Sequence, residues 1–221
     1  MEGKIPRKGA LFFLTKLFIK NHEDVNNRKV RKQYGNLASI AGITVNLLLF
    51  FAKFAAGMLS GSISIVGDAF NNLSDAGSSV ISFISFKLSS KPADKEHPFG
   101  HARIEYISSS LVAVVILFIG FELLKTSIDR IINPEAVILS AVTVIILVVA
   151  VASKFWLYYL NKRIGTYIDS ALMHATAADN LSDVLATSAV LVSAVVEQFT
   201  DFRIDGYMGV IVSCFIMVSG I

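Results

Sequence analysis

Residues 67–75 read GDAFNNLSD, and they stand inside an apolar run that extends over residues 63–86. A second polar stretch, ADNLSD at residues 178–183, stands inside another apolar run, at 171–197. Each run has the roughly 20 residues with which a helix crosses a hydrocarbon core of about 30 Å. An aspartate at the centre of such a helix costs about 2.5–3.5 kcal/mol even on the lenient insertion scale, so it needs a functional reason. The two stretches therefore predict a membrane protein with a polar site between its helices.

Apolar runs of similar length occur along most of the chain. The composition agrees, with 54% hydrophobic and 17% charged residues among 221 and a mean hydropathy of +0.63, which is too apolar for a soluble domain. We therefore expect an all-α membrane protein with six transmembrane helices. The apolar runs lie at residues 37–59, 63–86, 107–128, 137–160, 171–197 and 206–221.

The distribution of basic residues predicts the topology. Lys and Arg are concentrated in the first 35 residues and in the loops 87–103 and 161–169, whereas the other connections carry only Arg130 and Arg203. By the positive-inside rule both termini are cytoplasmic. The net charge of +3 is small, and its bias indicates topology rather than a nucleic-acid partner.

The expected organisation is a cytoplasmic N-terminal segment, residues 1–35, followed by a transmembrane domain, residues 36–221. Residues 9–20 mix Phe and Leu with Lys, which favours an amphipathic helix on the bilayer surface; the alternative is a helix packed on the protein itself. The last apolar run stops at Ile221 with no polar tail, so we expect a truncated sixth helix.

The candidate site consists of two pairs of oxygen-bearing side chains. Asn71 and Asp75 are four residues apart, as are Asp179 and Asp183, so each pair is offset by only about 40° and points one way from its helix. The pairs lie near the middle of their runs, on helices that cross in opposite directions. We expect Asp75 beside Asp179 and Asn71 beside Asp183.

Three carboxylates this close cannot all stay ionised in a low dielectric without a counter-charge, which a bound dication or protons would supply. The arrangement therefore indicates an antiporter in which metal and protons compete for the same oxygens. The competing interpretation is that the candidate ligands only form hydrogen bonds to neighbouring helices. We expect that structural role for four other residues, namely Asn72, Asn180, Ser74 and Ser182.

Three further charged residues lie within the predicted helices. Asp68 faces much the same way as Asn71, and it either lines the exit path of the ion or belongs to a hydrogen-bond network. Lys53 lies deep enough to require a partner or a water path. For Lys154 the simplest interpretation is that its ammonium reaches the nearest interface.

These residues occur together with further motifs, and the chain as a whole resembles the cation diffusion facilitators over about residues 35–221. The additional matches are NLLLF at 46–50, SGS at 60–62 and HPFGH at 97–101. The resemblance implies a six-helix homodimeric exporter of divalent metals in exchange for protons, not an enzyme and without a resident cofactor. It also implies a cytoplasmic C-terminal domain, which this sequence lacks, and a location in the plasma membrane.

The first position of each pair departs from the zinc-exporting members of the family. In those members the site looks like Asp or His followed by Asp on the second helix, and His followed by Asp on the fifth. Here those positions are Asn71 and Asp179. Imidazole suits zinc, whereas carboxylate and amide oxygens suit harder ions such as manganese. The site therefore resembles that of the manganese-exporting branch, and the predicted cargo is Mn²⁺, with Zn²⁺ or Fe²⁺ as the alternative.

A second cluster is formed by Asp94, His97 and His101, whose counterparts in some zinc exporters form a subsidiary cytoplasmic site. Pro98 and Gly100 argue against the helix that would bring the two histidines onto one face, so a structural role in the loop is the alternative.

Another class with paired membrane aspartates is the intramembrane aspartyl protease. The chain has no Gly-x-Gly-Asp stretch, and Asn71 breaks the symmetric pair of acids that such chemistry uses.

Overall fold

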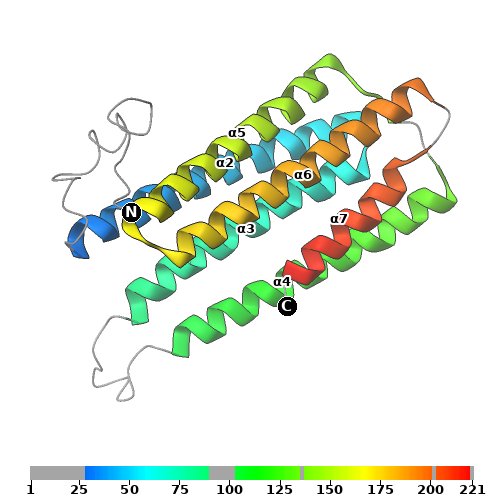
Figure 1. Ribbon diagram of the computed structural model, residues 1–221. Coiled ribbons are helices and arrows are strands. Elements are labelled where there is room, and N and C mark those ends of the chain that lie inside the picture. The colour runs from blue at the N-terminus through cyan, green and yellow to red at the C-terminus, as the bar shows by residue number, and fades with distance from the viewer. Residues whose placement is uncertain (1–27, 90–102, 135–136, 201–202, 220–221) are drawn as a thin grey trace. The chain divides into compact units, whose positions relative to one another are not determined.

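The computed structural model describes residues 28–89, 103–134, 137–200 and 203–219, and all regular structure within these ranges is helical (Figure 1). The predicted all-α fold is thereby confirmed. By length and composition, the segments Gln33–Ser60, Ala141–Ile168 and Leu172–Phe199 can cross a membrane, and Asp205–Val218 is a shorter apolar helix. The helices are α2 (Arg28–Ser60), α3 (Ile63–Ser89), α4 (Arg103–Ile132), α5 (Ala141–Ile168), α6 (Ala171–Phe199) and α7 (Asp205–Ser219).

The chain divides into two compact units, which are described separately. The first unit consists of residues 1–42 and 149–185, and the second unit consists of residues 43–148 and 186–221. Helices α2, α5 and α6 are each divided between the units, with one segment in the first unit and one in the second. The predicted surface helix at residues 9–20 lies outside the described residues.

In the second unit α3, α4 and α7 pack closely on one another. Gly120 of α4 allows this approach, because a Cβ atom there would lie 2.5 Å from Cγ and 3.3 Å from the backbone nitrogen of Met217 in α7. Small residues at membrane-helix interfaces permit such contacts. The buried apolar core of this unit consists of Ala56, Ile65, Ile116, Leu123, Leu147, Val190, Val212 and Ile216.

Two buried carboxylates join the helix ends of the second unit. Asp205, at the start of α7, caps the first turn of α3, and Glu197 of α6 caps the start of α7, where orphan N–H groups favour an anion. Together these contacts place the C-terminal end of α6 beside the N-terminal end of α3, so the two helices are antiparallel here. Asp205 accepts hydrogen bonds from Ser62 Oγ, Ile63 N (2.8 Å), Ser64 N (3.2 Å) and Ser64 Oγ (2.6 Å), and Glu197 accepts from Val137 N (3.4 Å), Ile204 N (3.2 Å) and Asp205 N (3.0 Å).

The first unit contains a tight hairpin between α5 and α6. Only Asp169 and Ser170 connect the helices, and Asp169 takes a positive φ of 49°, while Ser170 N donates to Gly165 O at 2.9 Å. Gly165 lies against α6, since a Cβ atom there would be 3.1 Å from Cβ of Met173.

The prediction of a loop at residues 161–169 is wrong, because α5 continues to Ile168. The charged residues Lys162 and Arg163 lie on an exposed face of α5, and the helix continues past them. Helix α2 likewise begins at Arg28, before the apolar run at 37–59.

Candidate intramembrane site

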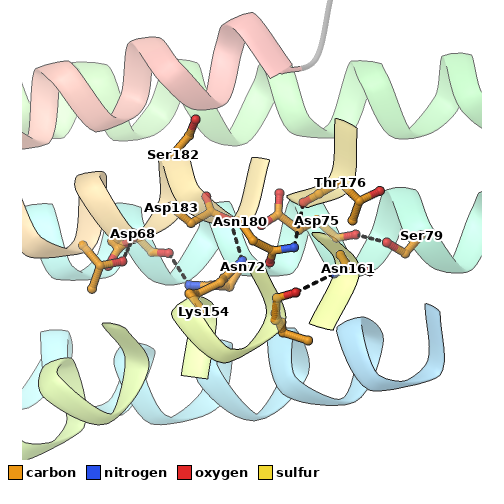
Figure 2. A network of polar contacts seen from close by, with 12 residues as sticks. Asp68, Asn72, Asp75, Ser79, Lys154, Asn161, Thr176, Asn180, Ser182 and Asp183 are labelled. Atoms are coloured by element: carbon orange, nitrogen blue, oxygen red, sulfur yellow. Dashed lines mark hydrogen bonds and ion pairs between the residues drawn. The ribbon is translucent and has the colours of Figure 1, made fainter. Parts of the chain in front are cut away.

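Helix α3 carries the first candidate pair, Asn71 and Asp75, in the second unit. Both side chains are half-buried. Nearby groups use their hydrogen bonds within the helix, since Asn72 Nδ2 donates to Asp68 O at 2.8 Å and Ser79 Oγ donates to Asp75 O at 2.8 Å (Figure 2). We expected Asn72 to hydrogen-bond a neighbouring helix, but this bond is made to its own helix instead.

Helix α6 carries the second candidate pair, Asp179 and Asp183, in the first unit. The intervening Asn180 and Ser182 bond back to their own helix, since Asn180 Nδ2 donates to Thr176 O at 2.7 Å and Ser182 Oγ to Ala178 O at 3.2 Å. Asp179 is exposed and Asp183 is half-buried.

Lys154 of α5 forms an ion pair with Asp183 in the first unit. Lys154 Nζ lies 2.6 Å from Asp183 Oδ2, and the two side chains are 1% and 14% exposed (Figure 2). The expectation that Lys154 extends to the membrane interface is therefore wrong. The ammonium instead pairs with an acid on the neighbouring helix, as charged groups within membrane helices commonly do.

Lys53 of α2 has the partner that its depth requires, and this partner is Asp68. Lys53 Nζ lies 2.7 Å from Asp68 Oδ2 and donates to Thr187 Oγ1 at 2.9 Å, while Thr187 Oγ1 donates to Asp68 Oδ1 at 3.1 Å. All three residues belong to the second unit, and the lysine and aspartate side chains are 0% and 3% exposed. This Lys53–Asp68–Thr187 triad favours the hydrogen-bond network over the exit path as the role of Asp68.

Each unit supplies one candidate pair, and within either unit the described residues bring together no three His, Cys, Asp or Glu side chains that could hold a metal. The second cluster, Asp94, His97 and His101, lies outside the described residues. Sequence reasoning missed the pairing of Lys154 with Asp183. The sequence does contain a signal for this pairing: Lys154 lies 15 residues before Asp169, in the hairpin connection, and Asp183 lies 14 residues after it.

Apolar helices that contain paired charged side chains define an integral, multi-pass membrane protein, because the bilayer tolerates buried charges only when they are paired or functional. The family model described as the cation efflux transmembrane domain matches residues 39–221, so the chain belongs to this family of cation diffusion facilitators. The resemblance found in the sequence is thereby confirmed. The family consists of transporters rather than enzymes, which leaves the protease interpretation without support.

Three relatives illustrate the match. An uncharacterized transporter of Methanocaldococcus jannaschii is 31% identical over 80% of this chain and 62% of its own length. The cation-efflux pump FieF of Shewanella oneidensis is 30% identical over 81% of this chain and 61% of its own. The manganese efflux system protein MneS of Bacillus subtilis is 27% identical over 75% of this chain and 57% of its own length. The chain thus spans about three-fifths of the length of these relatives.

Proposed function

We propose that the chain is the membrane part of an exporter that exchanges Mn²⁺ for protons by alternating access. Asn71, Asp75, Asp179 and Asp183 hold the ion, which is the cargo and not a resident cofactor. The family membership supports a divalent metal as the substrate class. The protein works as a homodimer in the plasma membrane, with both termini in the cytoplasm.

The observation that carries this proposal is the presence of two pairs of oxygen-bearing side chains, each pair four residues apart on one helix, in a chain of the cation efflux family. A separate contact, between Asp68 and Thr187, joins the two helices within the second unit. Thr187 Oγ1 donates to Asp68 Oδ1 at 3.1 Å, and this bond connects α3 with α6 inside one unit. The contact fixes the register of two antiparallel helices at this level.

Each candidate pair lies within about two helical turns of one residue of this contact along its own helix. The α3 pair begins three residues after Asp68 and ends seven after it, and the α6 pair begins four residues before Thr187 and ends eight before it. At 1.5 Å per residue these offsets are about 4.5 and 10.5 Å on α3, and about 6 and 12 Å on α6. In the proposed site Asp75 lies beside Asp179 and Asn71 beside Asp183, as the four-residue spacing of both pairs in the sequence suggests.

The donor atoms support manganese as the cargo. All four side chains offer oxygen, which suits harder ions, and none of the four is an imidazole, which would favour zinc. The relative MneS is named as a manganese efflux system, whereas FieF is named only as a cation-efflux pump. Zn²⁺ or Fe²⁺ export is the second candidate, because raw affinity rises from manganese towards the later metals at most sites.

Proton exchange follows from the charge of the site. The three carboxylates repel one another strongly once the dication leaves, and protonation relieves this repulsion. Metal and protons thus occupy the same oxygens in turn. The loop residues Asp94, His97 and His101 remain a proposed secondary metal site.

Metal flux into proteoliposomes tests the cargo. We expect the full-length protein to transport Mn²⁺ better than Zn²⁺, Fe²⁺ or Co²⁺, with counter-movement of protons. The variant Asp179→His introduces an imidazole, and we expect it to shift the ratio of zinc to manganese transport upward by about tenfold or more, since one tenfold change corresponds to only about 1.4 kcal/mol.

A wild type that transports Zn²⁺ as well as Mn²⁺ would refute the manganese assignment. An unchanged metal preference in Asp179→His, with wild-type amounts of folded protein, would show that the ligands do not set selectivity. Replacement of the exposed His174 by Gln, five residues earlier on α6, controls for a general effect of altering this helix.

A further inference from the structure

An ammonium group already occupies one oxygen of a proposed metal ligand. Lys154 Nζ lies 2.6 Å from Asp183 Oδ2, and the lysine side chain is 1% exposed. This distance is that of a short charge-assisted hydrogen bond. A cation that arrives at Asp183 therefore meets a cation that is part of the protein.

The hairpin between α5 and α6 builds this pairing into the fold. Lys154 precedes Gly165 by 11 residues, and Asp183 follows Met173 by 10, while Gly165 packs against Met173. Two antiparallel helices joined at this point place residues at equal separations from the contact at one level. The ion pair is thus a consequence of helix register and not of a lysine that happens to reach an acid.

From these observations we infer that Lys154 is a tethered competing cation, which occupies Asp183 when the transport site is empty and weakens metal binding there. The inference rests on the proposed function, because it assumes that Asp183 is a ligand of the cargo. It requires no change in the protonation of Lys154.

The charge of the site gives this role a physical reason. Three carboxylates and one amide carry a charge of −3, and the ammonium reduces it to −2, which matches a divalent ion. Without Lys154 the site would be more negative, and a dication would bind more tightly and leave more slowly. An exporter must release its cargo in every cycle. The ammonium group of Lys154 would promote this release by competing with the metal for Asp183.

Removal of the ammonium tests the inference. In the variant Lys154→Met we expect the Kd for Mn²⁺, measured by isothermal titration of the full-length protein, to fall by about tenfold, a typical coupling between two interacting sites. In proteoliposomes we expect KM and kcat to fall together, because release becomes slow. Lys154→Arg keeps the charge and is expected to bind Mn²⁺ with nearly wild-type affinity.

Lys162→Met is the matched control, since Lys162 lies two turns further along α5, is exposed and donates to Tyr158 Oη at 2.8 Å. If Lys154→Met does not fold, Lys154→Gln is measured instead, which removes the charge but retains a donor. A folded variant with unchanged or weaker Mn²⁺ binding would overturn the inference. If wild type and Lys162→Met bind no Mn²⁺, the proposed function itself fails.

Discussion

Replacement of Asp75 by asparagine is expected to abolish Mn²⁺ transport. The two side chains have nearly the same shape, but the amide lacks the negative charge on which a hard dication depends. Loss of groups that merely support metal ligands costs about 10–100-fold in affinity, and loss of a charged ligand is expected to cost at least about 100-fold. Isothermal titration with MnCl₂ and Mn²⁺ flux in proteoliposomes measure both effects.

Asp129→Asn is the matched control for this substitution. Asp129 lies in the same unit, on an exposed face of α4, where its Oδ1 accepts a hydrogen bond from Asn133 Nδ2 at 3.0 Å. We expect this variant to bind and transport like the wild type. Normal Mn²⁺ binding by Asp75→Asn would remove Asp75 from the site.

Replacement of Lys53 by methionine is expected to cause the largest loss of stability. It leaves the carboxylate of Asp68, whose side chain is 3% exposed, buried without its cation, and breaking such a pair costs about 3–5 kcal/mol. The Lys53–Asp68–Thr187 triad connects α2, α3 and α6, so we expect these helices to separate at lower denaturant concentration. Unfolding in detergent, followed by circular dichroism, measures the change.

The double variant Lys53→Met with Asp68→Asn removes both charges, and we expect it to recover part of the lost stability. Lys125→Met on the exposed face of α4 should have little effect. Equal stability of Lys53→Met and the wild type would mean that the ion pair contributes nothing to the fold.

Much of the fold follows from local sequence patterns. Apolar runs of about 20 residues identified the helices because a bilayer fixes their length. The four-residue spacing identified the candidate pairs because helix geometry places such residues on one face. The depth of Lys53 correctly indicated that it needs a partner.

The features that could not be predicted depend on contacts between distant segments. The ion pair of Lys154 and Asp183 requires the length of the α5–α6 connection, which was wrongly expected to span residues 161–169 because charged residues resemble loop residues. The caps made by Asp205 and Glu197 were missed for a similar reason, since an acid near a helix end indicates a cap but not which helix it caps.

The most direct test of the proposed site is anomalous diffraction at the manganese absorption edge, from crystals of the full-length protein soaked in MnCl₂. We predict a peak within coordination distance of side-chain oxygens from Asn71, Asp75, Asp179 and Asp183. A peak that contacts only one of the two pairs, or manganese bound only elsewhere in the protein, would contradict the account.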